Sequence, residues 1–409
     1  MNLAFATRAL RSRNYRLYFT GQSVSLIGTW MTRIATSWLV YRLRGSAALL
    51  GVVGFAGQIP AFVLGPIAGV WVDRWDRHRT IVITQILSTV QSFALAFLAL
   101  AHIITVWEIV ALALVQGLIS AFDMPARQSF VIQMVEHRED LGNAIALNSS
   151  MVNAARLIGP AIAGVVVASV GEGYCFLIDG ISYLAVIVSL LMMRIAEAPA
   201  KKPARVMAHL NEGWLYVVHS VPIRSILLNL SIVSLFGMPY SVLMPIFASK
   251  VLGGGAHTLG FLMAATGVGA LAGAMTLAAR RNVVGLGRRI VITTSLFGVS
   301  LVVFSLSRSL WLSLLTLPVV GFGMIQQMAA SNTILQTIVD DEKRGRVMAF
   351  YSMAFQGMAP FGSLLAGSVA ARFGAPVTVT VSGVACVLGS AWFASRLREI
   401  RQIVRFSSA

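Results

Sequence analysis

The chain of 409 residues is apolar and basic: 57% of its residues are hydrophobic, 11% are charged, and the formal net charge is +17. Soluble domains carry roughly 25% charged residues, so this composition excludes a soluble protein with a single anchor and indicates a polytopic membrane protein. A basic soluble protein would suggest a nucleic-acid partner, but here most Lys and Arg residues lie in alternate connections between apolar segments, as the positive-inside rule describes.

Apolar segments long enough to cross a bilayer recur twelve times along the chain. They lie near 17–40, 47–71, 80–100, 104–122, 143–168, 173–193, 223–247, 257–279, 289–306, 310–331, 345–370 and 375–395. The even-numbered connections are basic and the odd-numbered ones are not, so we expect both termini in the cytoplasm. The basic N-terminal residues lead directly into the first span, so we expect no cleavable signal peptide.

The predicted fold class is an all-α membrane protein of twelve transmembrane helices in two six-helix bundles. We expect an N-terminal bundle over 1–193, a linker over 194–222, a C-terminal bundle over 223–395 and a cytoplasmic tail over 396–409. In the linker, Val206, Leu210, Trp214 and Val217 recur at helical spacing, which predicts an amphipathic helix on the inner membrane surface.

A short charged turn separates the second and third spans. Residues 69–80 read Gly-Val-Trp-Val-Asp-Arg-Trp-Asp-Arg-His-Arg-Thr. This stretch resembles the signature loop of the major facilitator superfamily, with matches at Gly69, Asp73, Arg74 and Arg79. The resemblance implies a conformational latch formed by Gly69, Asp73, Arg74, Arg77 and Arg79, in which Asp73 pairs with a helix N-terminus or an arginine. The alternative is an ordinary positive cytoplasmic loop.

The two halves of the chain repeat each other. A shift of 203 residues aligns 133–171 with 336–374 without gaps and brings Gln133, Glu139, Gly142 and Gly159 onto identical residues. Two parallel repeats of six helices are the architecture of these transporters, which implies alternating access to a site near the membrane midplane.

The fifth span carries Gly159-Pro160 followed by Gly164, which resembles the Gly-Pro motif of superfamily antiporters. The alternative is a simple proline kink with close packing. Residues 121–128 and 143–149 are similar to the branch that includes enterobactin exporters and macrolide-efflux proteins. This resemblance implies export of a siderophore or drug.

Charged residues inside spans are costly and usually functional. Arg33, Arg156 and Asp179 lie within predicted spans, whereas Asp123 and Glu108 lie at predicted boundaries. We expect Asp179, Asp123 or Glu108 to take part in proton coupling, with a structural role for Asp179 as the alternative.

Polar residues at helical spacing predict the cargo site, because such stripes cannot face lipid cheaply. The candidate substrate-binding residues are Gln22, Ser25, Thr29, Arg33, Ser149, Asn153, Arg156, Tyr240, Gln327, Ser352 and Gln356. Arginine suits a carboxylate, phenolate or phosphate of the cargo. The alternative is that Arg33 and Arg156 pair with backbone carbonyls or Asp179 and fix helix packing.

Taken together, these patterns predict a secondary transporter of a bacterial cytoplasmic membrane, not an enzyme, that exports an amphipathic small molecule in exchange for protons. We expect no cofactor, no metal site, no nucleic-acid partner and a monomer. The alternatives are a lipid or lysophospholipid flippase on the same fold and a transport-inactive sensor or partner subunit.

Overall fold

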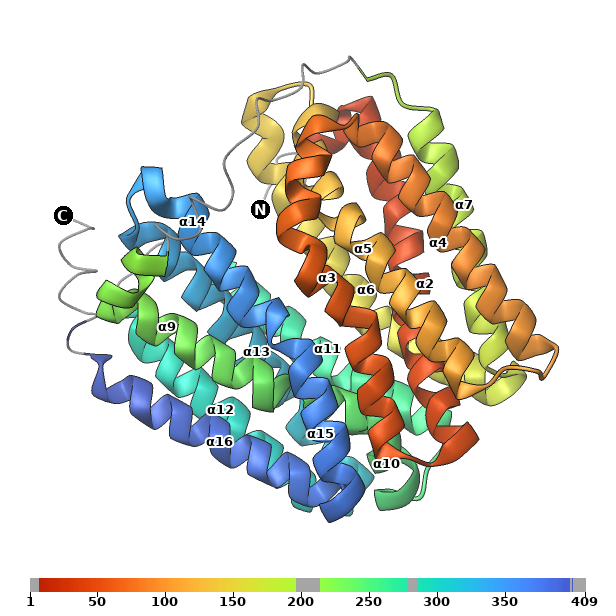
Figure 1. Ribbon diagram of the computed structural model, residues 1–409, viewed down its shortest axis with the longest axis vertical. Helices are drawn as coiled ribbons and strands as arrows, with labels where there is room; N and C mark the ends of the chain where they lie inside the picture. The colour runs from red at the N-terminus through yellow and green to blue at the C-terminus, as the bar shows by residue number, and fades with distance from the viewer. Residues whose placement is uncertain (1–6, 196–213, 279–284, 398, 400–409) are drawn as a thin grey trace. The chain divides into compact units, whose positions relative to one another are not determined.

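The computed structural model describes residues 7–195, 214–278, 285–397 and 399, and within these ranges the chain is helical with no strand (Figure 1). The elements in chain order are η1 (Arg8–Arg11), α2 (Arg13–Arg44), α3 (Ala47–Arg74), α4 (Arg77–Leu100), α5 (Val106–Met134), η2 (Arg138–Asp140), α6 (Leu141–Val170), α7 (Glu172–Leu191), α9 (Val221–Ile232), η3 (Val233–Gly237), η4 (Met238–Leu243), α10 (Met244–Ile246), η5 (Phe247–Val251), α11 (Ala256–Ala278), α12 (Leu286–Leu306), α13 (Leu310–Ile338), α14 (Asp341–Ser352), η6 (Met353–Gly357), α15 (Ala359–Phe373) and α16 (Ala375–Ser395).

Within the described residues, 10 helical segments are long and apolar enough to cross a membrane. The 32-residue helix α2 and the run from α14 through η6 to α15 occupy the places of the first and eleventh predicted spans. The predicted all-α membrane fold is therefore confirmed. Two helices continue well past their predicted spans: α5 runs to Met134 instead of ending near residue 122, with Pro125 inside the helix, and α13 runs to Ile338 instead of ending near residue 331.

The chain divides into two compact units. Unit 1 comprises Met1–Arg44 and Ala56–Ala204, and unit 2 comprises Gly45–Phe55 and Arg205–Ala409. Helix α3 therefore contributes its beginning to unit 2 and the rest of its length to unit 1. The predicted division into 1–193, 194–222, 223–395 and 396–409 stays a prediction.

In unit 1, helix α7 packs along both α2 and α4 (Figure 1). Glycines on α2 permit the close crossing with α7. A Cβ added at Gly21 would lie 2.6 Å from the hydroxyl of Ser189, and one added at Gly28 would lie 2.8 Å from a carboxylate oxygen of Asp179. Small residues at a helix contact are the usual means of close approach in membrane proteins.

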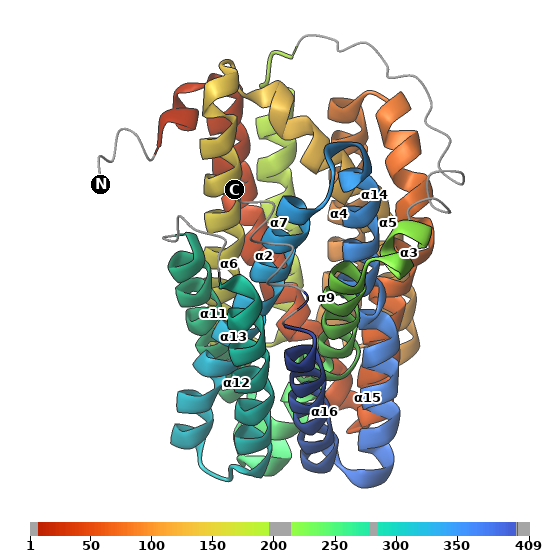
Figure 2. The same ribbon diagram turned by 90° about the vertical axis from the view of Figure 1, so that its left-hand side faces the viewer.

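Glycines also permit two close helix crossings in unit 2, one between α12 and α16 and one between α11 and α13 (Figure 2). Between α12 and α16, a Cβ at either Gly298 or Gly383 would lie 2.6 Å from the carbonyl oxygen of the other. Between α11 and α13, a Cβ at Gly321 would lie 2.0 Å from the carbonyl oxygen of Thr266. These positions admit no side chain without helix displacement.

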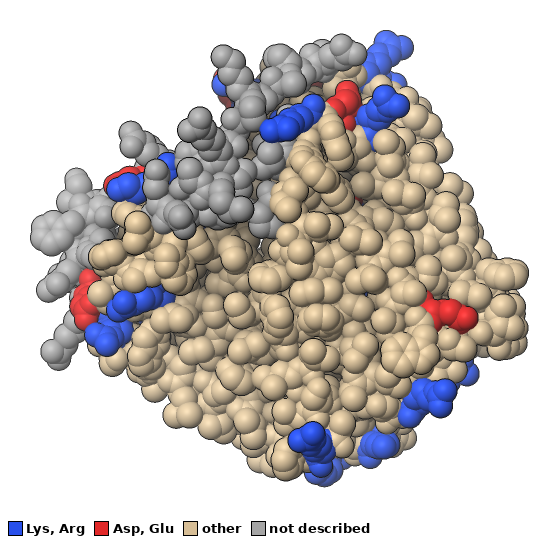
Figure 3. Space-filling model, viewed as in Figure 1, with Lys and Arg blue, Asp and Glu red and all other residues tan. Residues whose placement is uncertain are grey.

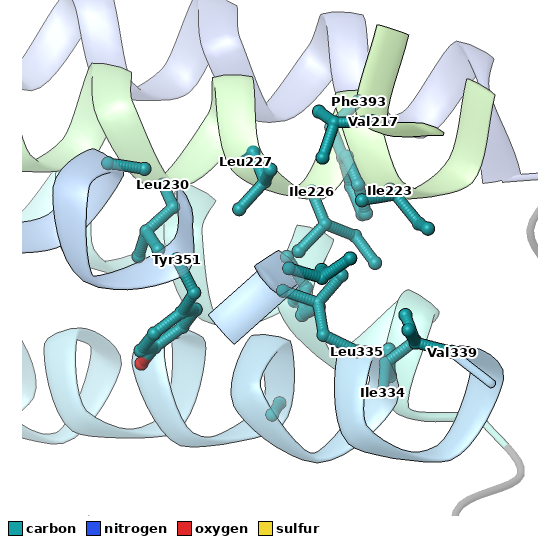
Figure 4. Close-up of a cluster of buried hydrophobic side chains, with 14 of the residues drawn as sticks. Val217, Ile223, Ile226, Leu227, Leu230, Ile334, Leu335, Val339, Tyr351 and Phe393 are labelled. Atoms are coloured by element: carbon teal, nitrogen blue, oxygen red, sulfur yellow. The ribbon is translucent and has the colours of Figure 1, made fainter. Parts of the chain in front are cut away.

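A buried apolar cluster at one end of unit 2 joins α9, α13 and α14 to the end of the linker (Figure 4). Val217 is 4% exposed within it, and Trp214 packs on Phe350 with ring centroids 5.9 Å apart. The end of the predicted amphipathic helix thus packs on unit 2. Its other predicted apolar residues, Val206 and Leu210, lie outside the described residues.

Charged side chains are few on the helical surfaces. Figure 3 shows broad areas without charge, with Lys and Arg gathered near helix ends. Large apolar side chains such as Phe97, Trp107 and Leu315 are more than two-thirds exposed, which suits contact with lipid.

Candidate functional site

An aromatic side chain in unit 1 contacts two arginines. The guanidinium carbon of Arg33 lies 4.9 Å from the ring centroid of Trp30, and that of Arg156 lies 5.3 Å from the same centroid. Both distances fall within cation–π range. Arg33 and Trp30 come from α2 and Arg156 from α6, so the contact brings together two of the predicted substrate-binding residues.

A glycine on α6 sets this geometry. A Cβ added at Gly159 would lie 2.5 Å from the Cβ of Trp30 and 3.0 Å from the carbonyl oxygen of Ile27. Helix α6 can therefore approach α2 closely only because residue 159 is glycine. Pro160 is buried beside it and Gly164 is buried one turn further, all within one continuous α-helix from Leu141 to Val170. Close packing at Gly159 is the role that the structure gives to this motif.

Another polar group lies where α2 meets α7 and α4. Asp179 is 1% exposed, and its Oδ2 accepts hydrogen bonds from the hydroxyls of Thr32 (2.8 Å) and Ser92 (3.2 Å). Its Oδ1 has no hydrogen-bond partner among the described residues. One turn further along α7, the hydroxyl of Tyr183 lies 3.2 Å from that of Thr29. No ion pair within 4 Å joins Asp179 to Arg33 in the described part of the chain.

A second carboxylate lies inside α5. Asp123 pairs with Arg127 at 2.5 Å, and its Oδ1 accepts hydrogen bonds from Thr84 (2.7 Å) and Gln85 (2.9 Å) on α4. The side chains of the pair are only 17% and 20% exposed. Asp123 is thus a shielded ion pair within the helix and not a residue at its end, contrary to the predicted span boundary. Glu108, the third predicted coupling residue, accepts from the backbone N–H of Thr105 at 2.6 Å and closes the capping box that begins α5.

The candidate substrate-binding residues on α2 and on α6 differ in how deeply they are buried. On α2, Gln22 and Ser25 are 3% and 0% exposed, and Gln22 Oε1 and Ser25 Oγ lack partners among the described residues. On α6, Ser149 is exposed and its carbonyl oxygen accepts from Asn153 Nδ2 at 2.8 Å. The polar stripe on α2 is therefore buried, whereas the one on α6 reaches the surface.

The predicted residues of unit 2 are scattered over several elements. Gln327 on α13 is 1% exposed, and neither its Oε1 nor its Nε2 has a partner among the described residues. Tyr240 is buried against Phe297, with centroids 6.4 Å apart, which is ordinary aromatic packing. Ser352 and Gln356 are exposed, the latter in the five-residue π-helix η6.

The signature loop is a tight turn between α3 and α4. Arg74 ends α3, and Asp76 caps α4 by accepting from the backbone N–H of Arg79 at 2.6 Å. A Cβ placed at Gly69 would meet no described atom within 4 Å. The side chain of Asp73 lies outside the described residues, and its pairing stays a prediction.

A row of buried polar residues on α4 was not among the predicted site residues. Thr80, Thr84, Ser88 and Ser92 recur at every fourth position, and all four are at most 7% exposed. This spacing places them along one ridge of the helix, and that periodicity was the signal available in the sequence. Among the described residues no three His, Cys, Asp or Glu side chains form a group that could hold a metal ion.

The fold and these clusters can be compared with known proteins. Residues 4–408 match the model of a family described as transmembrane secretion effector. A staphyloferrin A transporter of Staphylococcus aureus is 25% identical over 391 residues, covering 94% of this chain and 97% of the relative. The multidrug efflux pump Tap of Mycolicibacterium fortuitum is 28% identical over 386 residues, covering 91% and 93%.

A solved structure supports the same fold. The crystal structure of the nucleoside transporter NupG, in a mutant form, superposes with a TM-score of 0.71 at 14% identity, covering 94% of this chain and 99% of the other. At this identity the likeness concerns the fold alone.

Proposed function

Because the chain belongs to the transmembrane secretion effector family of the major facilitator superfamily, we propose that it is an exporter of amphipathic small molecules with an anionic group. The predicted superfamily and the prediction of a transporter, not an enzyme, are confirmed by the family match. The chain is a multi-pass membrane protein with bacterial relatives, for which we propose the cytoplasmic membrane.

The observation that carries the proposal is the pair of arginines on Trp30. A charged side chain in a membrane span is costly and marks a substrate or ion pathway by default. Arg33 is nonetheless exposed near the middle of α2, and Arg156 comes close to the same indole from α6. Two permanently charged planar groups beside an aromatic surface suit a carboxylate, phenolate or phosphate attached to an apolar body.

We propose that buried polar residues of the same unit add neutral contacts for the cargo. Gln22 and Ser25 hold side-chain acceptors without partners among the described residues, and buried polar groups of this kind favour a hydrogen-bonding ligand. We propose alternating access as the transport mechanism, with Asp73 and the basic residues of the α3–α4 turn as the latch.

Proton antiport is the proposed energy source, and Asp179 is the proposed coupling residue. It is 1% exposed and has one carboxylate oxygen without a partner among the described residues, whereas Glu108 closes a capping box and Asp123 is paired with Arg127. Full transport driven by a pH gradient in Asp179→Asn would move this role to another residue.

The test is transport by the purified chain in proteoliposomes, with and without a pH gradient. The probes are a labelled siderophore that carries carboxylates, a labelled macrolide and a fluorescent lysophospholipid. Accumulation of the siderophore that depends on the gradient supports the proposal. Movement of the lysophospholipid alone would instead identify a flippase, and no movement of any probe in either condition would contradict the proposed export.

A further inference from the structure

We infer that unit 1 contains a proton pathway along helix α4 that connects the α3–α4 turn with the buried carboxyl group of Asp179. The inference deepens the proposed proton coupling and rests on it. It concerns side chains of a single compact unit, drawn from α2, α4, α5 and α7.

The pathway begins with the four-residue spacing on α4. Thr80, Thr84, Ser88 and Ser92 are 7%, 5%, 2% and 1% exposed. At 1.5 Å per residue the row covers about 18 Å of helix, and adjacent members are about 6 Å apart. One water molecule can bridge two hydroxyls at a step of this length.

Each member of the row contacts another polar group. The hydroxyl of Thr80 donates to the carbonyl oxygen of Asp76 at 2.7 Å, in the α3–α4 turn. The hydroxyl of Thr84 donates to Asp123, that of Ser88 accepts from Gln116 Nε2 at 3.4 Å, and that of Ser92 donates to Asp179. The row therefore joins the turn to Asp123 and Asp179.

Buried acceptors beside the row are available to bind water. Gln85 Oε1, Gln116 Oε1 and Asp179 Oδ1 are buried and have no hydrogen-bond partner among the described residues. Buried acceptors of this kind are the partners that ordered water needs.

Hydroxyl groups and water can each accept one proton and release another, so the row needs no titratable group between its ends. A proton that enters at the turn is passed from oxygen to oxygen and binds Asp179, and the reverse sequence releases it. Helix α4 itself has no titratable residue from Thr80 to Leu100.

The charged and titratable groups around Asp179 come from its own helix and from the helices packed against it. Arg33 on α2 acts on it electrostatically, as do Cys175 and Tyr183 on its own helix. Arg156 is the only titratable residue of α6, which also packs on α7, and Asp123 and Arg127 of α5 act electrostatically on Tyr183. A protonation change at Asp179 thus alters the field at Arg33, which belongs to the proposed cargo site.

The experiment follows protonation of Asp179 by time-resolved infrared spectroscopy of the full chain in proteoliposomes. Light-triggered release of a caged proton starts the reaction, and the band missing in Asp179→Asn identifies the carboxyl group. Protons are the probe, so no cargo is needed and failure of the export proposal leaves this test intact.

We expect Ser88→Val to slow the protonation of Asp179 by about tenfold or more, since it removes a relay group from a buried chain. Thr89→Val is the matched control: Thr89 is buried on the same helix, but its hydroxyl donates to the carbonyl oxygen of Gln85 at 2.8 Å and lies off the row. This variant should keep the parent rate.

A second variant, Gln116→Leu, removes the partner of Ser88 from the α5 side and keeps the test decisive if Ser88→Val does not fold. It should also slow protonation. Parent rates in both Ser88→Val and Gln116→Leu, equal slowing in Thr89→Val, or a parent protein whose Asp179 band does not change with pH would each overturn the inference.

Discussion

Replacement of Gly159 by alanine tests whether helix packing positions the arginine pair. The added Cβ would lie 2.5 Å from the Cβ of Trp30. Carbon atoms in contact sit about 3.5–4.0 Å apart, so α2 and α6 must separate by about 1 Å. Overpacking of this kind costs about 1–3 kcal/mol. Alanine gains back about 1 kcal/mol as the better helix former, so the expected net loss is about 0–2 kcal/mol.

The matched control is Gly142→Ala on the same helix, where an added Cβ meets no described atom within 4 Å. It gains the helix propensity without the steric cost and should be as stable as the parent or slightly more so. The measurement is the free energy of unfolding of the purified proteins in detergent, with tryptophan fluorescence as the signal. If Gly159→Ala were as stable as Gly142→Ala, the close approach at Trp30 would not be what holds α6 against α2.

Three further predictions concern other parts of the chain. Asp73→Asn should fold normally but transport at least about tenfold more slowly, because loss of a charge-assisted hydrogen bond in the latch costs about 1.5–3 kcal/mol. If this variant transported at the parent rate, the charged loop would only set the membrane topology. Asp123→Ala should lower the free energy of unfolding by about 3 kcal/mol, because it leaves the shielded charge of Arg127 without its partner carboxylate. A double variant that also carries Arg127→Leu should recover much of that loss in the same assay. Gly321→Ala should unfold more easily than Gly159→Ala, because its Cβ would lie 2.0 Å from the backbone oxygen of Thr266, which cannot rotate away; equal stability would contradict the close α11–α13 crossing.

The fold class and superfamily could be predicted because each depends on local sequence. Span length and loop charge identify the helices, and the loop after Gly69 identifies the superfamily. The site could be predicted only in part. Helical spacing places Thr29 and Arg33 on related faces of α2, but it cannot tell that Trp30 contacts both Arg33 and Arg156, since that depends on how closely α6 approaches at Gly159.

The polar row of α4 shows a second limit of prediction from sequence, which concerns the surroundings of a helix face. Its four-residue period is visible in the sequence, but the period does not say whether Ser88 and Ser92 face lipid, water or another helix. The structure supplies the missing information through Gln116 and Asp179, which contact the row from α5 and α7. Asp123 was assigned to a span boundary because the apolar segment ends near residue 122. Helix α5 continues through that proline to Met134.

The most direct test of the cargo site is transport of an anionic and a cationic probe by the same arginine variant. A labelled siderophore with free carboxylates and a macrolide with a protonated amine are offered to proteoliposomes that contain Arg156→Gln, with Arg372→Gln as a control at an exposed position on α15. Loss of a charged hydrogen-bond partner should slow siderophore transport by about tenfold or more. Macrolide transport by Arg156→Gln, and transport of both probes by Arg372→Gln, should stay near parent levels. An unchanged siderophore rate in Arg156→Gln, or an equal loss for both probes, would contradict an anion-binding role for the arginines at Trp30.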